Sequence, residues 1–507
     1  MSALDLVIIF AYLGGICALG VYFTRRQKTT KHYFTGDRSI PPWAIAASIV
    51  ATETSTVTFI SIPGVAFLPG GNFQFLQLVL GYLVGRIVVT LLFIPSYFRG
   101  DLLTVYQLLN RRFGAPARMV AASLFVVMRN VADGIRMLLT AFVLAAVVVA
   151  FRTDADFTTA LVGSILLLTV VMILFTYYGG IEAVVWVEVL QLGIYLAGAV
   201  AAAWVLAAKT PGGFQAAVDL GRQYGKFSVF DFAWNAGKTY TFWAGLVGGC
   251  FLTMSTHGTD QYMVQRYLCT DRPAKAGAAL LASGVAVLVQ FTLFLFIGVL
   301  LFAFYETNPA AKASLGSVPG DRVFPHFITN YLPPGLAGLV VAAIFAAALS
   351  SSLSAISSTV VNDLYRPLRP ARDDVHYLRV SKLLVFVFGL VQMGVALALI
   401  RTKRSAVDQV LGVAGLVNGP VLGLFLVGSM SKRVTQIPAL IGMLVSVMAM
   451  TLIWWFYSRQ IAWPWYPLIG STIVVVIGLA LAPLFPKGEP KDQRGFEVVQ
   501  AACAIKP

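Results

Sequence analysis

The stretch VATETSTVTF at residues 50–59 interrupts an apolar segment that would otherwise suit a membrane-spanning helix. Six of its ten residues are polar, and they carry five hydroxyl groups and one carboxylate, Glu53. A charged side chain inside a bilayer costs about 2.5–3.5 kcal/mol on insertion scales, so such residues usually face a protein interior or a water-filled cavity. The stretch therefore indicates a membrane protein with a polar centre.

The composition of the whole chain supports this interpretation. Of its 507 residues, 58% are hydrophobic and only 12% are charged, and the mean hydropathy is +0.81. A soluble protein of this length needs more polar residues to cover its surface. The net charge of +15 does not indicate nucleic-acid binding, because the basic residues lie in short loops between apolar runs. The four cysteines form no CxxC pair, so neither a disulfide framework nor a zinc site is expected.

Apolar segments of about 20 residues, the length that spans a bilayer, recur along the chain. We predict thirteen: 4–24, 42–68, 73–97, 117–150, 158–178, 184–207, 238–257, 277–303, 334–361, 377–400, 406–429, 436–457 and 465–485. Basic residues concentrate in alternate loops, and cytoplasmic loops carry the excess of Lys and Arg. This predicts an external N-terminus and a cytoplasmic C-terminal tail, with RTKR at 401–404 as the exception. The longer external connections, 208–237 and 304–333, have room for short surface helices.

The second segment combines a polar helical face with residues that disfavour a helix. Ala51, Thr54, Ser55 and Thr58 share one face, at spacings i, i+3, i+4 and i+7. Pro63 and Gly64 predict a break in the helix, and a break would free backbone carbonyls that suit a hard cation. The alternative is that the hydroxyls bond their own backbone and Glu53 pairs with a neighbouring helix.

Three further groups of polar residues lie in predicted spans. Arg129, Asp133 and Arg136 form a charged stripe, either an internally paired network or a contact for a charged or polyhydroxylated ligand. Ala347, Ser350 and Ser351 would bring oxygens together that suit sodium, or would simply allow close helix packing. The stretch THGTDQYMVQRYL at 256–268 would in the simplest case cap a helix at the membrane interface. No arrangement indicates a nucleophile triad or a hydrolase metal site, so a carrier is favoured over an enzyme.

Together these features resemble the sodium:solute symporter family, which includes sodium/glucose, proline and sialic acid transporters. The resemblance covers nearly the whole chain. It is carried by GDRSIPPWAIAASIVATETSTVTFISIPG at 36–64, YYGGIEAVVWVEVLQ at 177–191, HGTDQYMVQR at 257–266, and the Ala/Ser-rich segment that ends in NDLYRP.

The resemblance implies an all-α LeuT-type fold in one membrane domain spanning 1–507. Its parts would be an extra N-terminal helix at 4–24, inverted five-helix repeats at 42–207 and 238–429, two C-terminal helices at 436–485 and a cytoplasmic tail at 486–507. Binding sites in such folds lie near the bilayer midplane, beside broken helices, and transport proceeds by alternating access.

The resemblance also implies a sodium site. Its ligands would be the carbonyls of Ala51, Thr54 and Ala347 and the hydroxyls of Ser350 and Ser351. The helix before NDLY is about three residues shorter than in the family, so an alternative register moves both serines one turn away and weakens the site. A second sodium site, which some relatives have, would use Glu188 and Ser354.

By the same resemblance, the solute cavity would be lined by Glu53, Ser55, Thr58, Phe73, Gln77, Asp133, Thr253 and Thr256. Sialic acid transporters place an arginine for the solute carboxylate where this chain has Asp133, and Arg136 lies one turn further. Glu53 replaces an uncharged residue. Family position turns its carboxylate towards the cavity, whereas helical geometry turns it towards the stripe that contains Arg129.

We therefore predict sodium-coupled symport of a small polar organic solute: a sugar, an amino acid or a carboxylate. The partners would be the solute, sodium and the lipid bilayer, with no nucleic acid and no organic cofactor. The chain would act as a monomer in the plasma membrane, the inner membrane of a bacterium. The alternatives are a proton-coupled or sodium-independent carrier that uses Glu53 or Asp133, and a sensor that keeps the carrier fold.

Overall fold

The polar stretch 50–59 divides one apolar segment into two helices, α3 (Pro42–Glu53) and α4 (Thr56–Phe67). In the computed structural model their axes are bent by 59° with respect to each other. The last helical hydrogen bond of α3 runs from Thr54 N to Val50 O. The side chain of Ser55 then caps α4 by accepting a hydrogen bond from Thr58 N, at 3.4 Å.

The break lies about two turns before the position that Pro63 and Gly64 predict. Pro63 is inside α4. Neighbouring backbone packs closely against Pro63 and Gly64. A Cβ at Gly64 would meet Gly320 O at 2.5 Å, and a Cβ at Gly298 would meet Pro63 O at 2.2 Å. The proline therefore fits a tight helix contact, and the break forms where the hydroxyl-rich residues cap the chain.

A second broken helix lies later in the chain. A π-helical turn, η3 (Ala244–Gly248), leads into α11 (Gly249–Gly258), and α12 (Gln261–Tyr267) follows after Thr259 and Asp260. Asp260 caps α12, because its carboxylate accepts a hydrogen bond from Tyr262 N at 2.8 Å. Asp260 is 2% exposed. The stretch thus caps a helix, as its simplest interpretation predicts, and the cap lies in the protein interior.

The structure describes residues 2–24, 29–100, 102–151, 156–316, 320–349, 352–370, 372–400 and 406–485. Within these ranges all regular structure is helical. The other α-helices are α1 (Ala3–Thr24), α2 (Thr30–Thr35), α5 (Leu76–Leu92), α6 (Ile94–Tyr97), α7 (Tyr106–Phe113), α8 (Ala115–Phe151), α9 (Phe157–Lys209), α10 (Gly213–Gln223), α13 (Pro273–Thr307), α14 (Pro309–Leu315), α15 (Val323–Tyr331), α16 (Leu336–Leu349), α17 (Leu353–Thr359), α18 (Arg366–Leu368), α19 (Asp374–Ala398), α20 (Ala406–Met430), α21 (Gln436–Tyr457) and α22 (Tyr466–Leu481).

Short helical turns complete the described structure. They are η1 (Gly36–Arg38), η2 (Phe73–Phe75), η4 (Gly320–Arg322), η5 (Val360–Tyr365), η6 (Trp463–Trp465) and η7 (Ala482–Leu484). The long helix α9 bends at Gly180, whose φ of 58° and ψ of −168° suit only glycine. This bend separates the predicted spans 158–178 and 184–207.

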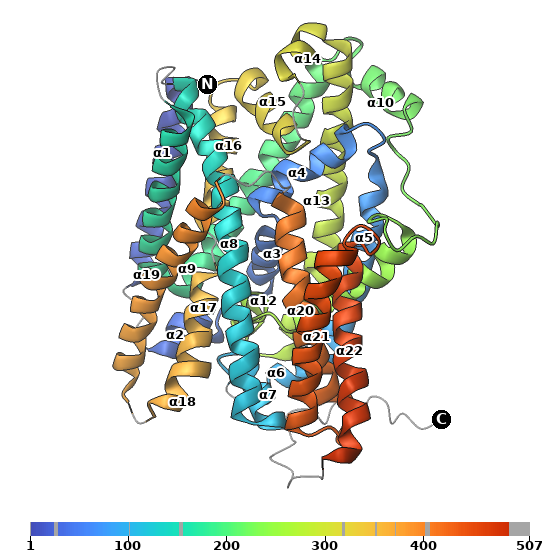
Figure 1. Ribbon diagram of the computed structural model, residues 1–507. Coiled ribbons are helices and arrows are strands. Elements are labelled where there is room, and N and C mark those ends of the chain that lie inside the picture. Colours follow the sequence, from blue (N-terminus) through green and yellow to red (C-terminus); the bar gives the residue numbers. More distant parts are fainter. Residues whose placement is uncertain are drawn as a thin grey trace.

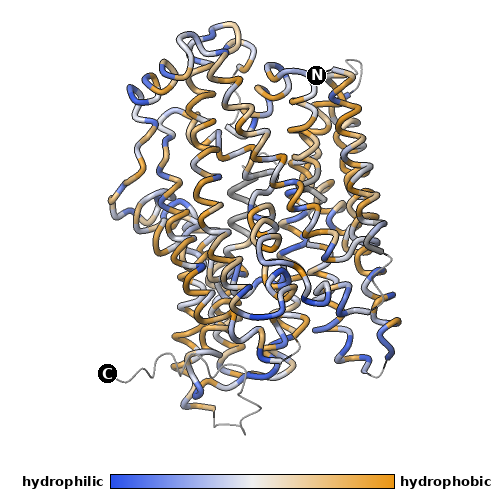
Figure 2. Tube along the Cα trace, turned by 180° about the vertical axis from the view of Figure 1, so that it is seen from behind, coloured by the Kyte–Doolittle hydropathy of each residue, from blue (hydrophilic) through white to orange (hydrophobic). Residues whose placement is uncertain are grey.

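The long helices form a bundle (Figure 1). Figure 1 places α10, α14 and α15 at the end where α1 begins, and α7 and α18 at the opposite end. The expectation of short helices in the connections 208–237 and 304–333 is thus confirmed by α10, α14 and α15. Hydrophobic residues cover the long helices, and hydrophilic residues are frequent near both ends of the bundle (Figure 2).

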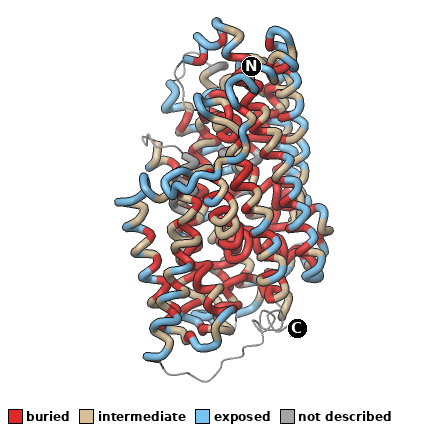
Figure 3. The backbone as a smooth tube through the Cα atoms, turned by 90° about the vertical axis from the view of Figure 1, so that its right-hand side faces the viewer, coloured by how far each residue is buried: buried red, intermediate tan, exposed pale blue. Residues whose placement is uncertain are grey.

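Eight helices in the described part of the chain are long and apolar enough to cross a membrane, and the bent pair α3–α4 makes up to nine. Large hydrophobic side chains are exposed on the outside of the bundle, among them Val7, Leu91 and Trp204, at 64%, 65% and 73%. Figure 3 shows the buried residues gathered in the interior. A lipid environment favours this arrangement, in which apolar side chains face outwards and polar residues are buried inside the bundle.

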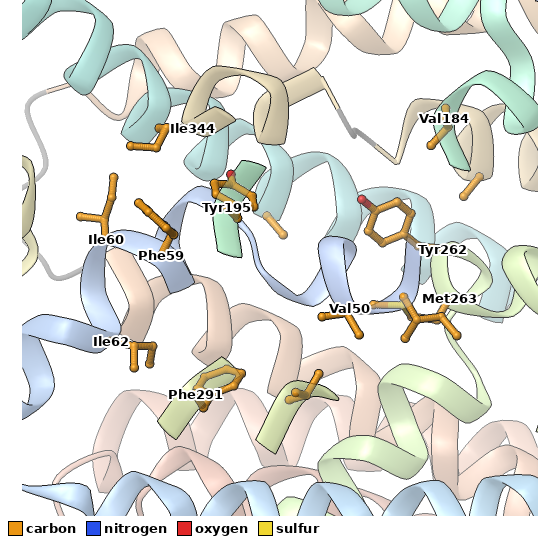
Figure 4. Close-up of a cluster of buried hydrophobic side chains, with 14 of the residues drawn as sticks. Val50, Phe59, Ile60, Ile62, Val184, Tyr195, Tyr262, Met263, Phe291 and Ile344 are labelled. Carbon is orange, nitrogen blue, oxygen red and sulfur yellow. The ribbon is translucent and has the colours of Figure 1, made fainter. Parts of the chain in front are cut away.

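Apolar packing holds the two halves of the broken segment in place. Phe59 on α4 stacks on Tyr195 of α9, with ring centroids 4.9 Å apart. Figure 4 shows this pair on one side of the break, and Tyr262 and Met263 near Val50 on the other. The hydroxyls of Thr56 and Thr140 are 3.0 Å apart, and Thr56 also donates to Ile344 O at 3.1 Å. The break is therefore surrounded by protein, not by lipid.

Candidate functional site

A cavity of about 220 Å³ lies beside the break between α3 and α4. Six of the predicted solute-binding residues line it: Glu53, Ser55, Thr58, Arg136, Thr253 and Thr256. Aromatic rings close further parts of the wall. Phe75 and Phe291 stack with centroids 5.1 Å apart, and Tyr82, Tyr262 and Trp463 also line the space. Aromatic walls with a few polar groups are typical of small-molecule sites.

The hydroxyl side of the cavity is organised by the break itself. Thr58 Oγ1 donates a hydrogen bond to Glu53 O at 2.9 Å, and it lies 3.4 Å from Ser55 Oγ. Thr256 Oγ1 donates to Leu252 O at 3.0 Å. Each hydroxyl is thus held in one orientation, and its oxygen can still accept a hydrogen bond from a bound molecule.

Glu53 borders the cavity, but its partners lie on α5 and α11. Its Oε2 accepts a hydrogen bond from Arg86 Nη2, and its Oε1 lies 2.8 Å from His257 Nε2. The side chain of Arg86 is 1% exposed and that of Glu53 is 14% exposed. The carboxylate therefore neutralises a buried guanidinium while it remains accessible from the cavity. Pairing of Glu53 with the stripe around Arg129 is contradicted.

A second, cationic side of the cavity is formed by α8. Arg136 lines the cavity, and its Nη1 lies 3.6 Å from Asp133 Oδ1. Arg129 also lines the cavity and forms an ion pair with Asp260. The Arg129 guanidinium lies 4.7 Å from the centroid of the Tyr262 ring, a cation–π contact. The predicted stripe is thus partly an internal network and partly a cavity wall.

Three predicted solute-binding residues do not line this cavity. Phe73 packs against Phe227. The Gln77 amide donates to Gln74 O and Tyr240 O and accepts from Asp231 N, so it holds the connection between α10 and η3 against α5. Asp133 is 4% exposed, and its Oδ2 accepts hydrogen bonds from the backbone N–H and the hydroxyl of Ser352, which precedes α17.

The break in α3 leaves carbonyl groups beyond the helical ladder. Because the last helical bond ends on Val50 O, the carbonyls of Ala51 and Thr54 have no helical partner. The contact between Thr56 and Ile344 O brings this region beside α16, the helix that carries Ala347. Ser350 and Ser351 lie outside the described residues, as do RTKR at 401–404 and the tail 486–507.

Glu188 lies in a fully buried polar network. Its carboxylate is paired with Arg266 of α12, whose Nε lies 3.2 Å from Oε2. It also accepts hydrogen bonds from Ser48 and from Thr52, the latter at 3.0 Å. The other residue of the predicted second sodium site, Ser354, accepts a hydrogen bond from Gln265 Nε2 at 3.2 Å. Neighbouring residues of α12 thus contact both candidate ligands.

Arg86, His257 and Arg266 have roles at the site that the sequence did not assign. Arg86 lies inside a predicted span, and this alone is a signal of function. His257 and Arg266 belong to a stretch noted for its polarity. Their partners Glu53 and Glu188 are distant in sequence, and only the fold brings these residues together.

Comparison with known proteins gives the family. A model of the sodium:solute symporter family matches residues 33–446. The sodium/sialic acid symporter NanT of Aliivibrio fischeri is 30% identical over 500 residues, which cover 97% of this chain and 95% of NanT. The sodium/sialic acid symporter SiaT of Proteus mirabilis is 30% identical over 493 residues, 95% of each chain.

Comparison with solved structures gives the same family and fold. The substrate-bound, outward-open structure of a Na+-coupled sialic acid symporter matches with a TM-score of 0.85 at 31% identity, over 96% of this chain and 99% of that one. A closed nucleobase-cation-symport-1 family transporter matches with a TM-score of 0.55 at 13% identity, which shows the fold alone; 92% of this chain and 97% of that one are covered. The chain therefore belongs to the sodium:solute symporter family, and it is a multi-pass membrane carrier that couples solute movement to sodium, not an enzyme.

Proposed function

We propose that the chain takes up a small acidic, polyhydroxylated solute of the sialic acid class together with sodium. The observation that carries this proposal is the cavity: a cationic wall with Arg136 faces the same space as the hydroxyls of Ser55, Thr58, Thr253 and Thr256. Guanidinium groups bind carboxylates with two parallel hydrogen bonds, and hydroxyls serve as both donors and acceptors for a sugar. The similarity to sialic acid symporters supports the same class.

Glu53 would contribute to recognition by accepting a hydrogen bond from a solute hydroxyl. Its carboxylate has lone pairs beyond those used by Arg86 and His257, and 14% of its side chain is exposed. The apolar faces of the solute would rest on Phe75, Phe291 and Trp463. Because the aromatic walls are rigid, they would order the solute at small entropic cost.

For the main sodium site we propose the carbonyls of Ala51, Thr54 and Ala347 and the hydroxyls of Ser350 and Ser351. Uncharged oxygens of this kind suit a monovalent cation. The unused carbonyls at the end of α3 and the proximity of α16 support it.

A second sodium site at Glu188 and Ser354 is also proposed. The buried carboxylate and the hydroxyls of Ser48 and Thr52 beside it support this site. Sodium would have to share Glu188 with Arg266, so this site would be the weaker of the two.

We propose thirteen spans, arranged as inverted repeats at 42–207 and 238–429. The additions would be the helix at 4–24, the helices at 436–485 and the tail at 486–507. Support comes from the broken helices α3–α4 and α11–α12, which begin the two repeats, and from the bend at Gly180. The grouping of α10, α14 and α15 at the end where α1 begins supports an external N-terminus, because these helices lie in the connections predicted to be external. With thirteen spans the C-terminus would then be cytoplasmic, and we propose that the transport unit is a monomer.

The proposal is tested with purified protein in proteoliposomes. An inward sodium gradient should drive uptake of sialic acid, and a neutral hexose of similar polarity should compete poorly because it lacks the carboxylate. A pH gradient without sodium should drive no uptake. Equal uptake in sodium-free medium would contradict sodium coupling, and strong competition by the neutral sugar would contradict the acidic solute class.

A further inference from the structure

Arg129 links the solute cavity to α12, the second half of the broken helix α11–α12. Its side chain is 11% exposed and lines the cavity, while its Nη2 pairs with Asp260. Within the described part of the chain, Arg129 Nε is buried and has no hydrogen-bond partner. A guanidinium carries five donors, and the ion pair with Asp260 engages Nη2. The arginine is therefore tied to the first turn of α12 while its side chain also borders the cavity.

The partner of Arg129 holds α12 at its first turn. Asp260 is the N-cap of this helix, and its side chain is 1% exposed. All residues of α12, Gln261–Tyr267, are buried. Side chains further along also anchor the helix: Gln261 accepts from Val105 N and donates to Leu103 O.

The remaining anchors lie away from the cavity. Gln265 donates to Phe34 O, and Arg266 pairs with Glu188, whose side chain is fully buried. Gln261, Gln265 and Arg266 do not line the cavity, whereas Arg129 does. Arg129–Asp260 is thus an ion pair that anchors α12 and that a bound solute can reach directly, beside the α12 residues Tyr262 and Met263 that also line the cavity.

We propose that Arg129 is a positioning residue that couples solute binding to the release of α12. An anionic group of the solute accepts hydrogen bonds from Arg129 and shares its positive charge with Asp260. Because a buried carboxylate depends strongly on its partner, this sharing weakens the hold of Asp260 on α8. The coupling is reciprocal: Asp260 competes with the solute for Arg129, so its charge lowers solute affinity. This inference rests on the proposed acidic solute.

The first experiment is Asp260→Asn in the full-length protein, with sialic acid and sodium as probes. Asparagine still caps α12, but it removes the competing charge. We expect the Kd for sialic acid to fall by roughly tenfold, within the usual range of coupling between sites. A purely structural ion pair predicts the opposite, an unchanged or weaker affinity. The matched control is Asp363→Asn, which removes a buried partner of Thr104 and Arg118 away from the cavity and should leave the Kd unchanged.

The second experiment reports on α12 itself. Cys269 follows α12, is 0% exposed, and can be alkylated only when this region opens. The other three cysteines, Cys17, Cys250 and Cys503, are replaced by serine, so that Cys269 is the single thiol in the protein. Sialic acid with sodium should accelerate alkylation of Cys269 in the otherwise native protein. In the Asp260→Asn variant, alkylation of Cys269 should already be fast without solute, and adding solute should accelerate it little.

A conservative variant completes the test. Arg129→Lys keeps a positive charge for Asp260 but loses the planar guanidinium, whose several donors can serve Asp260 and a solute anion at the same time. We expect weaker sialic acid binding with Cys269 still protected in the absence of solute. An Asp260→Asn protein that binds sialic acid no more tightly, or in which solute accelerates alkylation as in the native chain, would overturn the coupling. Absence of sodium-dependent sialic acid binding in the native chain would instead refute the proposed function.

Discussion

The two broken helices meet at the same cavity, but they are built differently. At the first break, between α3 and α4, the charged residue Glu53 is paired with Arg86 and His257, and carbonyls and hydroxyls remain available. At the second, between α11 and α12, the charged residue Asp260 is bound to α8 through Arg129. Free neutral oxygens suit ligand binding, whereas charges paired across helices hold one position until they are exchanged. The first break is thus suited to bind ligands, and under our proposal the ion pair at the second break is released when solute binds.

The largest loss of stability should come from removing the ion pair between Arg266 and Glu188, which anchors α12 at the second break. Arg266→Ala leaves Glu188 as an uncompensated buried charge, which should cost roughly 3–5 kcal/mol in the free energy of unfolding. Denaturant or thermal unfolding in detergent measures it. The double variant Arg266→Met with Glu188→Met should recover much of the loss. Equal losses for the single and double variants would show that the pair is not what stabilises α12.

A smaller loss is expected at the first break. Glu53→Gln leaves Arg86 buried with a neutral partner and should cost about 1.5–3 kcal/mol, the range for hydrogen bonds to charged groups. The cost is lower because Glu53 is partly exposed to the cavity. Unfolding and sialic acid binding are measured on the same preparation. A stable variant with lost affinity would assign Glu53 mainly to the solute, and a restored stability in Glu53→Gln with Arg86→Gln would support the ion pair.

The sodium site gives a functional test of the first break. Ser351→Ala removes a proposed ligand hydroxyl and should raise the sodium concentration for half-maximal uptake by roughly tenfold, since one hydrogen bond or ligand is worth about 1 kcal/mol or slightly more. Ser446→Ala is the control, because Ser446 bonds Gly470 O between α21 and α22, away from the cavity. An unchanged sodium requirement would favour the alternative register, in which this serine lies one turn from the ion.

The smallest effect concerns the helix caps. Ser55 caps α4 with a long hydrogen bond of 3.4 Å, so Ser55→Ala should cost only about 0.5 kcal/mol. Asp260→Ala removes both a cap and an ion-pair partner and should cost several times more. Thermal unfolding of the two variants side by side checks the order. Equal losses would show that the two breaks are held with similar strength.

Hydropathy and the polar stretch 50–59 predicted a helical membrane protein and the location of its centre. They misplaced the break, because Pro63 and Gly64 pack closely against Gly298 and Gly320 inside α4, a contact that no local pattern contains. Hydroxyl residues of the cavity were identified by their shared helical face and by resemblance. The partner of Glu53 was missed, because Arg86 and His257 reach it from other helices. Pairing between distant charges depends on the fold and is not encoded in local spacing.

Arginine–carboxylate pairing around the cavity has a consequence for the membrane voltage. Carboxylates of the described site are each matched by an arginine: Glu53 by Arg86, Asp133 by Arg136, Glu188 by Arg266 and Asp260 by Arg129. The voltage would then act mainly on the transported load. One sodium with a monoanionic solute would cross as a neutral load, driven by concentration alone. A second sodium would add one charge and about 2.3 kcal/mol per 100 mV. The current that accompanies uptake would therefore count the sodium ions.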